Sequence, residues 1–163
     1  KIYFPRAIVP ASSVIVSFVD LLISGMLLLA LMIWYNFVPD WRILTLPFFT
    51  AIAIAAAIGG GLWLAALNVR YRDFRHIVPF IVQFGFYISP VAYSSSIIPQ
   101  KWRLLYSLNP MVGVIDGFRW ATLSGASTIY LPGFLLSTIL VAVLLVSGIW
   151  YFRKTERTFA DVI

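Results

Sequence analysis

The chain contains no cysteine and a single histidine, His76, among its 163 residues. The absence of cysteine excludes disulfide bonds, iron–sulfur clusters and thiol nucleophiles. One histidine argues against a histidine-based zinc site. Charged residues are also scarce, at 11% of the chain, whereas an ordinary soluble domain carries about 25%. These shortages exclude several classes of metalloenzyme and thiol enzyme.

A phosphate-binding loop of the form GxxxxGK[ST] is also missing, because the run Gly59-Gly60-Gly61 leads into Leu62-Trp63 with no lysine. We therefore expect no nucleotide cofactor on this chain. The glycines instead predict close helix packing, with a hinge as the alternative. Each follows an alanine by four residues, in the pairs Ala55 and Gly59, Ala56 and Gly60, and Ala57 and Gly61.

Long apolar runs dominate what is present. Residues 43–67 contain no charge over 25 positions, and a helix of that length reaches about 37 Å, more than the ~30 Å hydrocarbon core of a bilayer. Three similar segments follow the same pattern. We predict an all-α polytopic membrane protein as a single domain, with spans at 13–37, 43–67, 77–93 and 130–152, the third being short and broken near Ser89-Pro90.

Basic residues predict the orientation of these spans. Cytoplasmic segments of membrane proteins carry an excess of lysine and arginine, so both termini (1–12 and 153–163) are expected to be cytoplasmic. The net charge of +6 then reflects topology and contact with membrane lipids rather than nucleic-acid binding. The cytoplasmic side holds Lys1, Arg6, Arg70, Arg72, Arg75, Arg153, Lys154 and Arg157, and the outer side holds Arg42, Lys101, Arg103 and Arg119.

The outer connection, residues 94–129, is too long for a turn and too polar to span. Pro99 precedes a short amphipathic segment, and Asn109-Pro110 is typical of the N-cap and first position of a second helix. We predict two short helices that either lie on the surface or form a re-entrant pair. Asp116 and Arg119, three residues apart, are expected to form an ion pair.

Four blocks together resemble a known family. They are KIYFPRAIVP, LNVRYRDFRHIVPF, ISPVAYSSSIIPQKWRLLYSLNPMVGVIDGFRW and a short charged tail. Their order and spacing resemble the permease subunit of type-2 ATP-binding-cassette exporters of polysaccharides and polyol phosphates, such as O-antigen, teichoic acid and capsule exporters. Members have six spans, and this sequence would begin just before their third.

The resemblance implies a non-enzymatic transport subunit, multi-pass in the bacterial inner membrane. It would form a homodimer, pair with ATPase subunits that bind ATP and Mg²⁺, and move a lipid-linked glycan. A type-2 exporter of a small molecule or drug remains an alternative. A different class, an ion channel or secondary transporter, would need more intramembrane charge or an inverted repeat.

Two cytoplasmic segments are candidates for coupling to the ATPase. The segment 1–10 exposes apolar side chains between two prolines; the resemblance implies a coupling helix, and the alternative is a helix anchored on the lipid surface. The turn 68–76 could contribute to the same contact or serve only topology. The predicted coupling residues are Tyr3, Phe4, Pro5, Arg6, Arg70, Arg72, Asp73 and Arg75.

Candidates for the conduit are one acid and a set of aromatic residues. Asp20 lies inside the first span, where a carboxylate marks a functional site or needs a hydrogen-bonding partner. Aromatic rings can stack on sugar C–H faces, but in membrane helices they more often serve packing. The candidate lining residues are Asp20, Phe80, Phe84, Tyr87, Tyr93, Trp102, Tyr106, Phe118 and Trp120.

Overall fold

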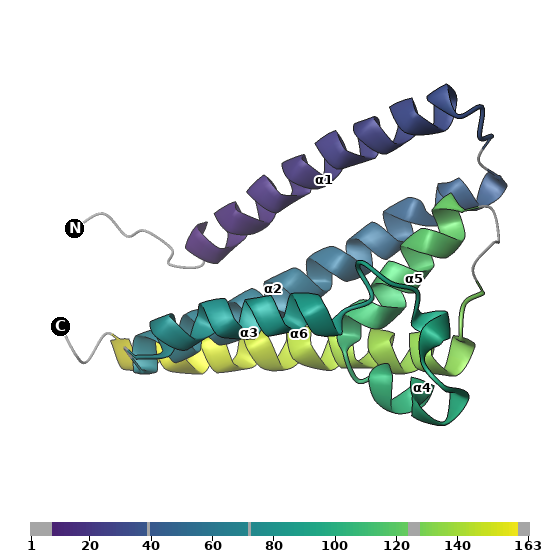
Figure 1. Ribbon diagram of the computed structural model, residues 1–163. Coiled ribbons are helices and arrows are strands. Elements are labelled where there is room, and N and C mark those ends of the chain that lie inside the picture. The colour runs from purple at the N-terminus through teal and green to yellow at the C-terminus, as the bar shows by residue number, and fades with distance from the viewer. Residues whose placement is uncertain (1–7, 39, 72, 124–127, 160–163) are drawn as a thin grey trace.

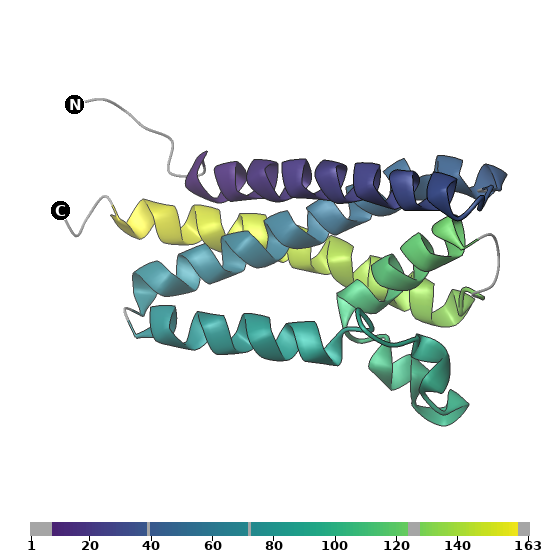
Figure 2. The ribbon, with the colours of Figure 1, turned by 45° about the horizontal axis from the view of Figure 1, so that its top comes forward.

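The computed structural model describes residues 8–38, 40–71, 73–123 and 128–159. These residues form α-helices and short 3-10 turns and contain no strand. The chain is therefore an all-α polytopic membrane protein, as predicted. Long helices run side by side along one direction, and the two short helices α4 and α5 gather near one end (Figures 1 and 2).

Three helical segments are long and apolar enough to cross a membrane. They belong to α1 (Ile8–Trp34), to the 3-10 turn η1 (Trp41–Thr45) continuing into α2 (Leu46–Arg70), and to α6 (Leu131–Phe159). Asp40 begins η1 by accepting a hydrogen bond from the backbone N–H of Trp41 at 2.7 Å. Helix α1 is exposed along most of its length, with Met32 buried near its end.

The third predicted span is helix α3 (Phe74–Ile88), which is shorter than the interval 77–93 suggested. Its 15 residues reach only about 22 Å, less than the ~30 Å of bilayer hydrocarbon. The helix ends at Ile88 because Pro90 disfavours helical backbone at Ser89, which is extended with ψ 143°. The predicted interval 77–93 is therefore helical only as far as Ile88, and the predicted break at Ser89-Pro90 is confirmed.

Helices α2 and α6 pack together at two glycines. A Cβ atom on Gly59 would lie 2.8 Å from the backbone of Leu145, and one on Gly148 would lie 2.6 Å from the carbonyl oxygen of Gly59. Such contacts are shorter than real Cβ atoms make, so both positions need a residue without a side chain. The close-packing interpretation is confirmed at Gly59, whereas Gly61 has open space around it.

Towards the end opposite α4 and α5, the same two helices share an aromatic contact. The rings of Trp63 and Tyr151 stack with centroids 4.5 Å apart, and Trp63 Nε1 donates a hydrogen bond to Ser147 Oγ at 3.0 Å. Next to them lies a buried cluster of Leu62, Ala66 and Phe152. Helices α2 and α6 thus form the packed centre of the fold, and α5 packs against both of them.

The predicted re-entrant pair corresponds to the short helices α4 (Gln100–Tyr106) and α5 (Pro110–Thr122), and its entry into the membrane stays a prediction. The Ser137 hydroxyl donates to the carbonyl of Ser107 at 3.0 Å, and Ser137 lies six residues, or about 9 Å, inside α6. The other end of α5 reaches η1, where the Trp120 and Trp41 rings meet edge to face at 6.5 Å. Helix α5 therefore starts beside Ser137 of α6 and ends beside η1, packed on α2 and α6 along its length.

The described ends of the chain, at Ile8 and Phe159, lie at the same end of the molecule (Figure 1). The turn between α2 and α3 lies there too, in both views (Figures 1 and 2). The two segments predicted to face an ATPase thus emerge on one side, although residues 1–7 and Arg72 lie outside the described residues.

Candidate functional site

The junction between α3 and the re-entrant pair is built around the end of α3 at Ile88. Such an end leaves carbonyl groups without intrahelical partners, which is costly where water is scarce. Ile88 is the last residue of α3, and its carbonyl oxygen accepts hydrogen bonds from Tyr106 Oη at 2.7 Å and Tyr93 Oη at 2.9 Å. The two hydroxyls are also 2.7 Å apart, and because each carries a single proton, they can make only two of these three hydrogen bonds at a time. Tyrosines from beyond the break therefore cap the helix.

Burial and the neighbouring Tyr93 hydroxyl raise the pKa of Tyr106. Desolvation disfavours the charged phenolate, and the hydrogen bond favours the neutral form. Tyr106 thus keeps its proton at all physiological pH values. Its hydroxyl remains a donor to the end of α3.

A second polar link joins the end of α3 to the start of α5. Ser89 is buried and donates its hydroxyl to the carbonyl of Gly85 at 2.7 Å, while the side-chain amide of Asn109 donates to Ser89 Oγ at 2.9 Å. Asn109 Oδ1 in turn accepts from the backbone N–H of Met111 at 3.0 Å. The predicted Asn109-Pro110 helix start is therefore confirmed, and the same asparagine ties α5 to α3.

Arg119 supplies a third link and corrects the predicted Asp116–Arg119 ion pair. Its Nη2 donates to the carbonyl of Val91 at 3.0 Å, in the loop that follows Pro90. An ion pair between described residues is found for Arg42 and Asp40, 3.6 Å apart, and not for Asp116 and Arg119. Val91 lies in a loop, where its carbonyl lacks the backbone partner that a helix would supply, and the Arg119 side chain takes that place.

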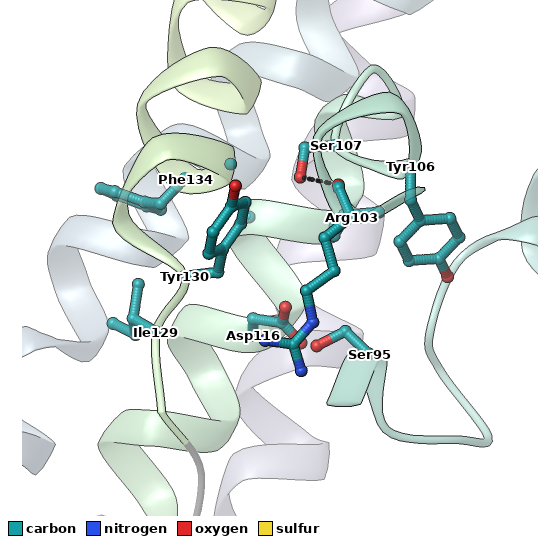
Figure 3. A pocket seen from close by; sticks show the side chains of 11 residues that line it. Ser95, Arg103, Tyr106, Ser107, Asp116, Ile129, Tyr130 and Phe134 are labelled. Atoms are coloured by element: carbon teal, nitrogen blue, oxygen red, sulfur yellow. Dashed lines mark hydrogen bonds between the residues drawn. The ribbon is translucent and has the colours of Figure 1, made fainter. Parts of the chain in front are cut away.

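Asp116 instead faces a small cavity between α4, α5 and the start of α6. Figure 3 shows its carboxylate beside the Ser95 hydroxyl and the Arg103 guanidinium. Burial raises the pKa of the Asp116 carboxyl, while the Ser95 hydroxyl and the charges of Arg119 and Arg103 oppose that rise. The cavity volume is about 20 Å³. No chemical reaction is indicated by this combination.

Aromatic packing holds the C-terminal half of α5 against α2. Phe49 is buried and lies 6.3 Å from Phe118 and 5.8 Å from Phe134, measured between ring centroids. The Arg42 guanidinium lies over the Trp120 ring at 4.9 Å, a favourable cation–π contact. Phe118 and Trp120, predicted as conduit residues, thus have packing partners of their own.

The remaining conduit candidates are distributed over separate surfaces. Asp20 is exposed on α1, and it has no hydrogen-bonding partner within the described part of the chain. The α3 stripe of Phe80, Phe84 and Tyr87 is exposed at 63–66% per residue. Trp102 on α4 is exposed as well. Among these candidates the structure brings Tyr93 next to Tyr106 and places Trp102 and Tyr106 around one pocket. A lining role for the set stays a prediction.

The candidate coupling residues that the structure describes lie at the opposite end from the re-entrant pair. Arg70 ends α2, and Asp73 and Arg75 flank the start of α3; all three are exposed. Tyr3, Phe4, Pro5, Arg6 and Arg72 are outside the described residues. Contact with an ATPase therefore stays a prediction for both segments. Within the described ranges, no group of three or more His, Asp or Glu side chains is placed to hold a metal ion.

Sequence reasoning missed the polar links of the junction. The sequence predicts only local roles for Ser89, Asn109 and Arg119. In the structure Asn109 bonds Ser89, 20 positions away, and Arg119 bonds the carbonyl of Val91, 28 positions away. The only local signal was the pair of Ser-Pro and Asn-Pro steps, which marks chain breaks that need outside donors. That signal locates the junction without identifying its partners.

Comparison with known proteins places the chain among membrane transport proteins. Residues 2–123 match the family described as ABC-2 type transporter. The chain is 25% identical, over its whole length, to the O-antigen export system permease protein RfbA of Klebsiella pneumoniae, covering 62% of that protein. It is 31% identical over 73% of its length to the protein of the same name from Myxococcus xanthus, covering 46% of it. The chain thus spans about half to two thirds of these curated relatives.

Proposed function

Because this chain belongs to the ABC-2 type transporter family, we propose that it serves in the permease of an ATP-driven exporter of a lipid-linked polysaccharide or polyol-phosphate polymer. The chain itself is a multi-pass inner-membrane transport segment of a type-2 exporter permease. The polymer, the ATPase partner with its ATP and Mg²⁺, and a homodimeric assembly belong to the proposal.

The observation that carries the proposal is the similarity to permeases named for O-antigen export, which extends over the whole chain in two of them. The re-entrant pair adds physical support. Broken backbone at membrane depth is tolerated where protein buries it or where it lines a water-filled cavity, and the break at Ser89-Pro90 is buried by protein. In this proposal the polymer passes beside the re-entrant pair, and the broken helices line its path.

In the proposed cycle, ATP-driven closure of the partner subunits presses on segment 1–10 and on the exposed turn that holds Arg70, Asp73 and Arg75. Helix α3 begins at that turn and ends at the Tyr93 and Tyr106 cap. A displacement of α3 would therefore reach the re-entrant pair directly. This route makes α3 the connection between the ATPase side and the outer side.

The test uses the full-length protein that contains this chain, tagged and purified in mild detergent. We expect an ATPase subunit to co-purify, with ATP turnover stimulated by lipid-linked glycans. Turnover stimulated by drugs but not by glycan lipids would indicate a small-molecule exporter. A clean preparation without any ATPase would point to a channel or a scaffold and would overturn the proposal.

Substitution of Tyr3, Phe4 and Arg6 in the full-length protein should uncouple ATP hydrolysis from export. We expect export to fall by at least tenfold while the protein still inserts and still binds its ATPase weakly, because these residues would transmit force rather than hold the fold. Export of the glycan into vesicles and ATP turnover are measured together. Exchanging Tyr35, an exposed residue on the other side of the membrane, for Phe is the control, and unchanged export by the triple variant would refute the coupling role.

A further inference from the structure

The cavity beside Asp116 contains one hydrogen-bonding group, Arg103 Nε, that the described residues do not satisfy. Arg103 Nε is buried and has no hydrogen-bonding partner among the described residues, yet the residue lines the cavity together with Asp116 and Ser95. The two charged side chains come from α4 and α5 and point toward the same space (Figure 3). No ion pair joins them, although the charge of Arg103 is felt at Asp116.

An unpaired buried N–H is destabilising, so native structures rarely leave one without a partner. The cavity volume of about 20 Å³ exceeds the ~10–15 Å³ that one water requires and is far too small for a phosphate or a sugar. A site for water also needs two to four polar partners. Arg103 Nε, the Asp116 carboxylate and the Ser95 hydroxyl meet that requirement.

We propose that this cavity binds one ordered water, which accepts a hydrogen bond from Arg103 Nε and donates one to the Asp116 carboxylate. The water's second hydrogen points to Ser95 Oγ or to the other carboxylate oxygen. Donor and acceptor types match: a guanidinium can only donate, a carboxylate can only accept, and water does both. The bridge joins α4 to α5 as a water-mediated ion pair, so the two outer helices move as one body. It depends on the packing of this chain and not on which substrate is exported.

A double-mutant cycle on the full-length protein in detergent tests the bridge. We expect Arg103→Gln to lower the Tm by about 5 °C, because Asp116 then lies buried without its bridged partner. In the Asp116→Asn background the same change should lower the Tm by only about 1 °C. Arg103→Lys, which keeps the charge but removes the Nε donor, should lower the Tm by nearly as much as Arg103→Gln does.

The comparison pair is Arg42–Asp40 on the same side of the molecule, whose side chains are 28% and 41% exposed. Exchanges of Arg42→Gln and Asp40→Asn should give near-additive Tm shifts, because a partly exposed pair contributes little and the loss of the Arg42 contact with Trp120 is common to both backgrounds. Additive shifts for Arg103 and Asp116, or a fully stable Arg103→Lys variant, would overturn the bridge. A density map of the full-length assembly that resolves ordered water should show one peak between Arg103 Nε and Asp116, and a direct contact there would overturn it equally.

Discussion

Replacing Gly59 with alanine should destabilise the full-length protein, whereas the same replacement at Gly61, two residues away on the same helix, should leave it as stable or slightly more so. At Gly59 the new Cβ would lie 2.8 Å from backbone atoms of Leu145, and backbone cannot move aside as a flexible side chain can. At Gly61 nothing lies within 4 Å. Overpacking of this kind costs about 1–3 kcal/mol.

The pair of variants separates packing from helix propensity. Alanine is favoured over glycine in a helix by about 1 kcal/mol, and that gain is common to both positions. The difference between the two Tm values therefore reports the contact with α6 alone. Gly148→Ala, whose Cβ would lie 2.6 Å from the carbonyl oxygen of Gly59, should behave like Gly59→Ala. Equal Tm values for the Gly59 and Gly61 variants would contradict the observed helix packing.

This packing also shows where sequence reasoning stops. Three small-residue pairs at the same spacing predict a close helix approach on α2, and the approach is found. The sequence pattern could not choose among Gly59, Gly60 and Gly61, because the choice depends on how α6 is rotated against α2. That rotation is fixed by distant contacts such as the hydrogen bond from Trp63 to Ser147.

The re-entrant pair likewise has features that the sequence predicts and contacts that it does not. Proline and asparagine act on their own backbone, so the break at Ser89-Pro90 and the helix start at Asn109-Pro110 could be predicted. The ion pair expected for Asp116 and Arg119 follows a rule for isolated exposed helices. In this fold the guanidinium reaches the carbonyl of Val91 instead. Local rules therefore predict where the helices break, but they do not predict which distant side chains donate hydrogen bonds to the carbonyl groups at those breaks.

Those remote donors lead to the prediction with the largest non-additive effect, at Tyr93 and Tyr106. Either hydroxyl can donate to the carbonyl oxygen of Ile88, at 2.9 and 2.7 Å. We expect each single exchange to Phe to cost about 0.5–1 kcal/mol, because the other tyrosine still caps the helix. The double exchange removes both donors and should add about 0.5–1.5 kcal/mol, the net value of a hydrogen bond to a carbonyl that is only partly shielded from water. Thermal unfolding of the full-length protein measures all three variants.

The cost of the double variant above the sum of the singles is the quantity that reports a shared cap. Tyr35, exposed near the outer end of α1, provides the control, and Tyr35→Phe should leave the Tm unchanged. Because both tyrosines bind the end of α3 from beyond the Ser89-Pro90 break, losing the cap should also weaken the mechanical link between α3 and the re-entrant pair. In the proposed exporter the double variant should then hydrolyse ATP but export poorly. Additive Tm shifts would mean that the two hydroxyls act separately, and the end of α3 would then need another source of stabilisation.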